Sequence, residues 1–295
     1  MISDQSIDGW LACIRERASA SMPALISVLD TYIAEARHGR NYVDKYLTTL
    51  PRGAKILEVG AGSLLLSCQL VREGYAVTAI EPVGEGFSHF NQMQELVRQA
   101  AALEGCLPVV LDQPAEKLDT QSHFDFAFSI NVMEHVDDVQ KVIACVFRSL
   151  KPNASYIFTC PNYHFPYEPH FDMPTLFYKQ LTAWFFRARI EHKENMPDPW
   201  GTWNSLNWIN VPMICGAAKK LEDVHIRFNK GLLVSTFERV GYDQQFTQRR
   251  SPLMRAVIPI LVRLKLHKLL GLIPATFQPI IDCKLTKLGR MRGTT

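Results

Sequence analysis

The sequence predicts an α/β fold with a mostly parallel sheet and helices on both faces. Between Lys55 and Phe158, short apolar runs of strand length alternate with helical stretches. Strands separated by helices of this length require right-handed crossovers, which join parallel strands. The run KILEV ends at a turn with two glycines, Gly60 and Gly62, and helical residues follow at once. The 295 residues, 47% apolar and 21% charged, are enough for one sizeable core.

Residues 1–50 are expected to form a helical cap. Apolar residues recur at three- and four-residue spacing in WLACIRERA, MPALISVLDTYIAEA and NYVDKYLTTL, as in a helix with one buried face. The pattern is broken near Pro23 and Gly39, where we expect helices to end.

The core is expected over residues 51–160, with strands KILEV, AVTAIE, PVVL, FDFAFSI and SYIFTC. Residues 161–230 show little periodicity, which favours an insertion that covers the ligand edge of the sheet. This segment is aromatic-rich and holds four tryptophans, Trp184, Trp200, Trp203 and Trp208. Residues 231–250 are expected to return to the core as a helix ending at Gly241 and then a strand.

Residues 251–295 form a basic tail. From residue 249 onward, ten lysines and arginines stand against Asp282 alone, although the whole chain carries only +3. Prolines interrupt the apolar stretches, so none reaches the roughly 18 residues that a spanning helix needs. The pattern favours a basic amphipathic helix in a membrane interface; packing against the domain or a second subunit is the alternative. The oligomeric state stays open.

The sequence predicts a cytoplasmic protein. Association with a membrane through the basic tail is compatible with this location. The N-terminus has early acidic residues and no apolar stretch of signal length. Seven cysteines are scattered without a close CxxC pair, which argues against a zinc site and fits reduced thiols.

The glycine turn is expected to hold a ligand with a ribose. In open α/β sheets, ligands bind beyond the carboxyl ends of the strands, and glycines let a ligand approach the backbone. Glu81 ends the next strand about twenty residues later, as required to accept hydrogen bonds from ribose hydroxyls. Leu65 occupies the last glycine position of a dinucleotide fingerprint, so a nicotinamide-dependent dehydrogenase is disfavoured.

Several stretches in the order expected of one family strengthen this interpretation. The segments EVGAGS, VTAIEP, LDQPAEKL, FDFAFSINVMEHV and LKPNASYIFTCPN together resemble the class I S-adenosylmethionine-dependent methyltransferases, in particular the group with the ubiquinone-type O-methyltransferases. The resemblance implies a Rossmann-like sheet of seven strands and S-adenosylmethionine as cofactor. It departs from the family at Leu64, where a third glycine is often present.

The resemblance also implies the cofactor-binding residues. Glu58 would lie near the amino group of the methionine part, Glu81 would hold the ribose, and Asn131 would lie beside the methyl group. Asp112 with Ala115 and Glu116 is the candidate for the adenine edge. The full predicted set is Glu58, Gly60, Ala61, Gly62, Glu81, Pro82, Asp112, Ala115, Glu116 and Asn131.

A hydroxyl acceptor needs a general base, because its proton leaves as the bond to the methyl group forms. Candidates come from two loops: His135 follows the fourth strand, and His164, Glu168 and His170 follow the fifth. We favour His164 or His170, because no helical or strand repeat explains the two histidines of that loop, whereas His135 could simply anchor its own loop. A packed histidine remains the alternative for each.

No metal is expected. Asn131, Glu134 and His135 resemble the ExxEH ligand motif of small-RNA 3′-end methyltransferases and some ubiquinone-type enzymes, but Asn131 replaces the first acid. An amide is a weaker ligand than a carboxylate for a hard cation.

The expected acceptor is a small, hydrophobic or lipid-linked molecule. The NPPY-like motif of nucleobase amine methyltransferases is missing after the fourth strand, and the chain before the tail has no basic excess, so nucleic acid is not expected. Aromatic side chains supply large apolar contact area, and the candidates are Tyr163, Tyr167, Trp203 and Trp208. O-methylation is favoured; N-methylation and a non-catalytic binding subunit are the alternatives.

Overall fold

The computed structural model describes residues 6–82, 88–176, 178–194, 196, 198–241, 247–248 and 252–289. The chain divides into two compact units. The first unit holds residues 1–130, 145–156 and 287–295, and the second holds residues 131–144 and 157–286.

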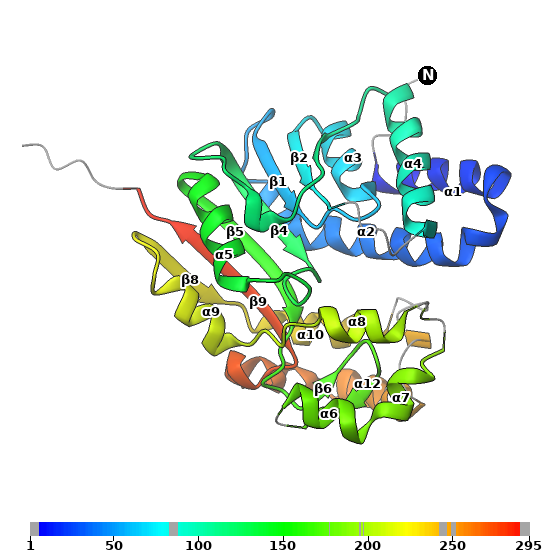
Figure 1. Ribbon diagram of the computed structural model, residues 1–295, viewed down its shortest axis with the longest axis vertical. Coiled ribbons are helices and arrows are strands. Elements are labelled where there is room, and N and C mark those ends of the chain that lie inside the picture. The colour runs from blue at the N-terminus through cyan, green and yellow to red at the C-terminus, as the bar shows by residue number, and fades with distance from the viewer. Residues whose placement is uncertain are drawn as a thin grey trace, which may run out of the picture. The chain divides into compact units, whose positions relative to one another are not determined.

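Seven strands form one sheet in the order β3-β2-β1-β4-β5-β9-β8 (Figure 1). β1 pairs in parallel with β2 and β4, and β2 pairs in parallel with β3. The predicted α/β class with a mostly parallel sheet of seven strands is confirmed. The strands are β1 (Lys55–Val59), β2 (Ala76–Ile80), β3 (Val109–Leu111), β4 (Phe124–Ile130), β5 (Leu150–Pro161), β8 (Val224–Phe228) and β9 (Ile280–Lys287).

The last two strands are not those expected from the sequence. β8 lies in the segment expected to be an insertion, and β9 lies in the basic tail. Ile281, Cys283 and Leu285 of β9 are buried at every second position, which is the period of a strand, although charged residues separate them. The strand expected before residue 250 falls largely on residues 242–246 and 249–250, outside the described residues.

The N-terminal helical cap is observed as α1 (Ile7–Ser21), the 3₁₀ turn η1 (Pro23–Leu25) and α2 (Ile26–Leu47). Pro23 separates the helices as expected, but the break expected near Gly39 is wrong, because α2 continues through it. A Cβ at Gly39 would lie 3.0 Å from both Leu66 Cδ2 and Ile130 Cδ1. Gly39 therefore permits close packing inside a helix, and does not end one.

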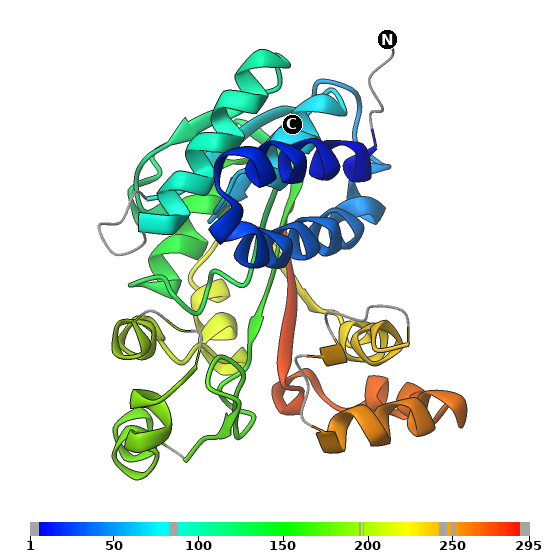
Figure 2. The ribbon, with the colours of Figure 1, turned by 90° about the vertical axis from the view of Figure 1, so that its right-hand side faces the viewer.

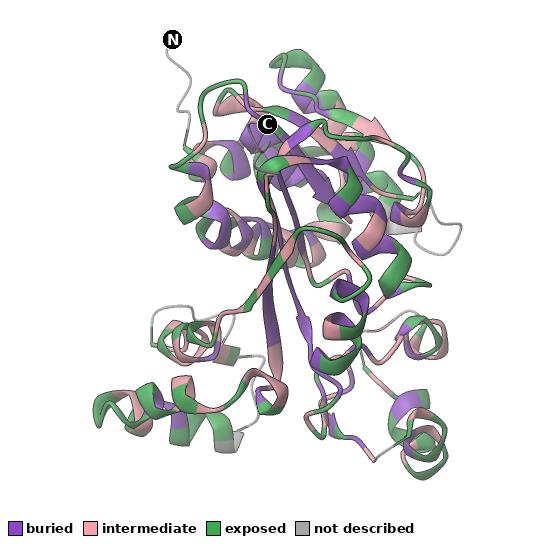
Figure 3. Cartoon of the chain, turned by 90° about the vertical axis from the view of Figure 1, so that its left-hand side faces the viewer, coloured by how far each residue is buried: buried purple, intermediate pink, exposed green. Residues whose placement is uncertain are grey.

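The first unit is completed by α3 (Leu65–Arg72), α4 (Ser88–Leu103), the 3₁₀ turn η2 (Ala115–Lys117) and the C-terminal part of α5 (Val139–Ser149). Its central strands are buried: Ile56, Leu57 and Phe128 have no exposed surface, and Figure 3 shows the strands as mainly buried ribbon. The fully buried Trp10 of α1 donates from Nε1 to the Leu65 carbonyl at 3.0 Å, which ties the cap to the start of α3.

The second unit holds the short helices of the aromatic-rich segment and most of the tail. A hairpin pairs β6 (Tyr167–Glu168) antiparallel with β7 (Met173–Pro174). Figure 2 shows α6 to α8 on one side of the unit's strands and α10 with α12 on the other. The helices are α6 (Lys179–Phe185), α7 (Arg187–Glu191), α8 (Pro199–Ser205), α9 (Val211–Ala218), α10 (Gly231–Arg239) and α12 (Pro252–Arg263), and the 3₁₀ segments are η3 (Leu266–Leu272) and η4 (Ala275–Phe277).

Among the helices of the described residues, none combines the length and the hydropathy that crossing a bilayer would require.

Candidate functional site

The glycine turn after β1 has the backbone that its sequence predicts. Gly60 and Gly62 have φ of 71° and 55°, and Leu64 at the start of α3 has φ of 66°. The backbone N–H groups of Gly60 and Ala61 donate to the Ile80 carbonyl at 2.8 and 3.1 Å. The turn is thereby fixed to the carboxyl end of β2, at the edge where ligands bind in such sheets.

Two carboxylates flank this turn. Glu81 Oε2 accepts from the Gly62 N–H at 2.8 Å. Glu58 is only 6% exposed and accepts a short hydrogen bond from the Ser67 hydroxyl of α3. Burial raises the pKa of Glu58 to about 8, and it also raises the pKa of Glu81. Burial disfavours the ionised form of both acids, and a cationic ligand at this turn would stabilise that form.

Two residues that the sequence did not indicate complete this edge. Gln94 of α4 is buried and donates from Nε2 to the Gly62 carbonyl at 2.9 Å. Burial raises the pKa of Tyr32 of α2, and the charges of Glu35 and Glu81 add to this effect. Both contacts join helices distant from the turn in sequence, so no local motif could reveal them.

The other predicted cofactor residues of the first unit follow β2 and β3. Pro82 is exposed next to Glu81, and Asp112 is exposed just after β3. Ala115 is buried at the start of η2, and the Glu116 carbonyl accepts from Cys145 Sγ at 3.5 Å. The backbone of Glu116 is thus fixed to α5, while the side chain of Asp112 is exposed.

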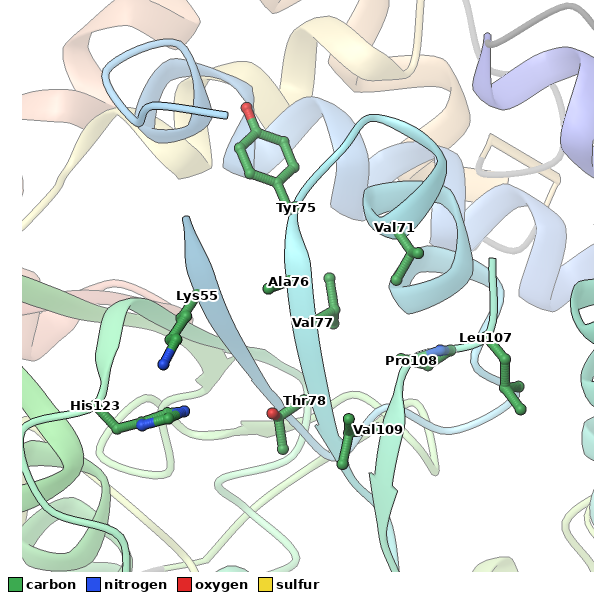
Figure 4. A pocket seen from close by; sticks show the side chains of 10 residues that line it. All are labelled: Lys55, Val71, Tyr75, Ala76, Val77, Thr78, Leu107, Pro108, Val109 and His123. Carbon is green, nitrogen blue, oxygen red and sulfur yellow. The ribbon is translucent and has the colours of Figure 1, made fainter. Parts of the chain in front are cut away.

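A pocket of the first unit lies elsewhere. Figure 4 shows it beside Lys55, Ala76 and Val109, the residues that begin β1, β2 and β3. Because the glycine turn follows the carboxyl end of β1, this pocket is at the opposite edge of the sheet from the predicted cofactor residues.

In the second unit, the loop after β4 begins at Asn131, whose φ is 55° and whose N–H donates to the Thr159 carbonyl at 2.9 Å. Glu134 in this loop is fully buried, and neither carboxylate oxygen has a hydrogen-bond partner. Burial raises the pKa of Glu134 to about 7. An unpartnered buried carboxyl group is costly and is typical of a functional site.

The loop after β5 brings a second set of polar side chains. Glu168 is fully buried and accepts three hydrogen bonds, from His170 Nδ1 at 2.6 Å, the Phe171 N–H at 2.6 Å and the Tyr163 hydroxyl at 3.1 Å. The His170 and His135 rings lie edge to face with centroids 5.3 Å apart. The structure therefore joins the two loops into one cluster, which we call the histidine cluster: Glu134, His135, Tyr163, Glu168 and His170.

The hydrogen bonds assign the tautomers of both rings. Ser205 Oγ donates to the Thr202 carbonyl at 2.8 Å, so it accepts from His135 Nδ1 at 2.9 Å. Because Nδ1 of His170 likewise donates to Glu168, each neutral ring carries its lone pair on Nε2. Burial, with a smaller effect of His170, lowers the pKa of His135 to about 4. His135 is therefore neutral at pH 7.

Glu134, His135 and His170 could also hold a metal ion, since one ligand atom from each lies within 4.8 Å of the others. Two imidazoles and a carboxylate suit a divalent transition metal. This set replaces Asn131 of the sequence motif with His170 from another loop. The expectation of no metal stays a prediction.

The remaining sequence candidates lie outside the histidine cluster or support it. His164 is exposed, with its ring centroid 5.7 Å from that of Phe277. Tyr167 donates a short hydrogen bond to Asp172. Trp208 stacks on Tyr163 with centroids 5.4 Å apart and is half-buried, whereas Trp203 is 1% exposed and packs against Trp208. Trp203 therefore serves the packing of this unit.

The chain was compared with known proteins. Residues 33–249 match the sequence model of a methyltransferase domain. An uncharacterized protein of Mycobacterium tuberculosis is 48% identical over 281 residues, which are 95% of each chain. The mitochondrial ubiquinone biosynthesis O-methyltransferase of Bos taurus is 34% identical over 113 residues, 37% of this chain and 29% of the relative.

Among solved structures, a protein of Galdieria sulphuraria assigned as a sarcosine dimethylglycine methyltransferase aligns with a TM-score of 0.50 and 18% identity. The alignment covers 87% of this chain and 88% of that one. At this identity the likeness shows the fold alone, a Rossmann-like sheet flanked by helices.

Proposed function

The chain belongs to the methyltransferase domain family and is an S-adenosylmethionine-dependent methyltransferase, and we propose that it methylates a hydroxyl oxygen of a small, hydrophobic acceptor. The observation that carries this proposal is the histidine cluster, in which His170 is hydrogen bonded to the buried Glu168 at 2.6 Å. In the proposal, His170 takes the proton of the acceptor hydroxyl.

Chain connectivity supports a role for the histidine cluster in methyl transfer. β4 pairs with β1, and Glu58 lies opposite Phe128 in their register. The two strands therefore reach the carboxyl edge together, β1 at the glycine turn and β4 at Ile130. Asn131, Glu134 and His135 follow within five residues. Ligands of such sheets bind at this edge.

His170 is better suited than His135 to accept a proton. The imidazolium that forms on His170 would be stabilised by Glu168, whose carboxylate accepts the Nδ1–H. Protonation of His135 is disfavoured, since its pKa is lowered to about 4. In the proposal, His135 stays neutral and accepts a hydrogen bond through Nε2.

Methyl transfer is a direct displacement, so holding the acceptor oxygen in line with the sulfonium methyl group supplies much of the rate.

The aromatic side chains beside the cluster favour an apolar acceptor. Tyr163 is hydrogen bonded to Glu168 and stacked on Trp208, so one ring joins the polar cluster to an aromatic surface. We include Trp208 and Tyr167 among the acceptor contacts. In the cofactor site, the proposal keeps the predicted roles of Glu58 for the amino group, Glu81 for the ribose and Asp112 for the adenine edge.

The first experiment is calorimetric titration of the full chain with S-adenosylmethionine, and separately with NAD. We expect micromolar binding of S-adenosylmethionine only, and loss of that binding in Glu81→Ala but not in the exposed control Glu16→Ala. A folded wild-type sample without binding would contradict the assigned cofactor residues.

The second experiment tests the base. With phenol, alcohol and amine acceptors, we expect methylation of phenols or alcohols. His170→Gln should lower kcat about 10²- to 10⁴-fold with little change in KM, because a general base contributes in this range. The residual rate should rise with pH as hydroxide replaces the lost base. His164→Gln is the matched control and should retain wild-type kcat.

Chelation separates proton transfer from metal assistance. Activity that survives exhaustive chelation is expected if His170 acts as a base. Activity lost on chelation and restored by a divalent metal would instead assign Glu134, His135 and His170 as its ligands. Methylation of amines alone would reject the hydroxyl acceptor and leave the cofactor assignment intact.

A further inference from the structure

The C-terminal part of the second unit exposes many large apolar side chains. Leu272 is 74% exposed, Leu264 60%, and Leu269 and Ile260 58%. We call this surface the C-terminal apolar face; it consists of Val257, Ile260, Leu264, Leu266, Leu269, Leu272 and Phe277, on α12, η3, η4 and the turn between α12 and η3. Monomeric proteins rarely leave such a concentration of apolar residues in water without a function.

The exposed face belongs to a folded segment. On its inner side, Ile258 and His267 are each only 3% exposed. His267 Nε2 is hydrogen bonded to Glu238 Oε1 of α10 at 3.1 Å, and Gln278 Nε2 donates to the Ile273 carbonyl at 3.1 Å. One side of the segment is thus fixed against the unit, and the outward side keeps its leucines exposed.

The charged residues of the segment that forms the face are all basic. Arg255, Arg263, Lys265 and Lys268 are exposed between and beside the apolar residues. No aspartate or glutamate occurs in the sequence from residue 252 to residue 281. An apolar surface on a segment whose charged residues are all basic is complementary to a bilayer with anionic headgroups, because acyl chains take up leucines while lipid phosphates attract lysines and arginines.

From this combination we propose that the C-terminal apolar face binds the surface of an anionic lipid bilayer, with α12 and η3 lying in the headgroup region. The face does not span the bilayer. Lysine and arginine side chains reach the phosphates while their aliphatic stems stay beside the leucines.

A second copy of the chain fits the same face poorly. A symmetric dimer places the same patch on both subunits, so the four cations of one copy would meet the four of the other with no acid in the segment to compensate. Like charges brought together in this way destabilise association. A bilayer supplies the opposite charge.

A second set of exposed residues is consistent with a bilayer. On α6, Trp184 is 76% exposed and Phe185 is 64% exposed, and Tyr178 just before the helix is 70% exposed. Figures 1 and 2 both show α6 and α12 at the same end of the second unit. Tryptophan and tyrosine are enriched at membrane interfaces, because the apolar ring contacts the lipid while its polar group stays hydrated.

The test is flotation of the full chain with vesicles of phosphatidylcholine, alone or with 30 to 40 mole per cent phosphatidylglycerol. We expect binding to the anionic vesicles and weakening by salt. The triple variant Arg263→Glu, Lys265→Glu, Lys268→Glu should reduce partitioning on the order of 100-fold, since each basic residue contributes about fivefold or more. The double variant Leu264→Ser, Leu269→Ser should reduce it at unchanged charge.

The matched control is Arg52→Glu, Lys141→Glu, Lys219→Glu, which makes the same change in net charge at exposed positions outside the face. It should float like the wild type apart from a small nonspecific loss. Wild-type protein that stays unbound, or a control that loses binding as fully as the triple variant, would overturn the proposal. A dimer in solution that the double leucine variant dissociates would overturn it in favour of a second copy.

Far-ultraviolet circular dichroism and a thermal unfolding scan, run on the same samples, show that each variant is folded. The proposal does not depend on the acceptor, because vesicle binding can fail while cofactor binding and methyl transfer persist.

Discussion

Glu58 is a buried acid that must bind a cationic group if it faces the methionine part of the cofactor. Its pKa of about 8 means that most of the protein carries a neutral Glu58 at pH 7. Binding of an ammonium group favours the carboxylate and releases the proton. We therefore expect the Kd for S-adenosylmethionine to fall about tenfold per pH unit from pH 6.0 to 7.5, below the usual α-amino pKa.

Titration calorimetry in buffers of different ionisation enthalpy measures the released proton directly. Glu58→Gln should bind more weakly and lose the pH dependence, whereas the exposed control Glu16→Gln should keep it. A Kd for the wild type that does not change over this pH range would show that binding does not change the protonation of Glu58, and would contradict its contact with the ammonium group.

The sequence identified the residues of the glycine turn because their geometry is local. Gly60 and Gly62 need positive φ, and Glu81 ends the adjacent strand at a fixed spacing. Gln94 and Tyr32 reach the same edge from helices far away in sequence, so only the tertiary structure reveals them.

The candidate histidines show the same limit. The sequence favours the second loop as the source of the base but does not separate His164 from His170, because both follow the fifth strand. The structure brings His135 next to His170 and leaves His164 exposed beside Phe277, because the hairpin of β6 and β7 turns the second loop back. No spacing in the sequence encodes that turn.

At the scale of elements, Asn162 fixes the start of the second loop to η4 and the residues after it. It is 1% exposed, and its Nδ2 donates to the carbonyls of Gln278 at 2.7 Å and Thr276 at 2.9 Å. Asn162→Ala would leave these buried carbonyls without donors, so we expect a loss of about 2 to 4 kcal/mol in unfolding free energy. Urea unfolding followed by circular dichroism measures the loss.

Asn204 at the end of α8 is exposed and serves as the matched control, with a change of about 0.5 kcal/mol or less expected for Asn204→Ala. If Asn162→Ala is equally mild, water replaces the amide as the donor to these carbonyls.

The sequence predicted the elements in which apolar residues recur with a clear period. It did not predict strands in which charged residues separate the apolar ones. β9 is the instructive case, since its buried residues alternate but Asp282 and Lys284 separate them in a basic segment. Asp282 is itself buried and accepts from the Asn229 side chain at 2.7 Å, a partner 53 residues away. A strand stabilised by such a distant contact resembles a charged tail in sequence.

At the scale of the whole molecule, the predicted tasks divide between the two compact units. The predicted cofactor residues other than Asn131 belong to the first unit, and the histidine cluster and the C-terminal apolar face belong to the second. In the proposal, methyl transfer uses residues of both units, whereas the bound cofactor directly stabilises the unit that contacts it. Measuring how much bound cofactor stabilises each part of the chain therefore tests this division of tasks between the two units.

Hydrogen exchange of the full chain measures this distribution. With S-adenosylmethionine at 100 times its Kd, binding stabilises the liganded state by about 2.7 kcal/mol, so amides that exchange through opening of the first unit should slow about 100-fold. We expect this slowing in residues 55–72 and 76–82 and little change in residues 252–277. NAD, or Glu81→Ala with S-adenosylmethionine, should leave both regions unchanged. Equal slowing of all three segments by S-adenosylmethionine would mean that the two units open as one cooperative block, so that cofactor binding also stabilises the segment that carries the C-terminal apolar face.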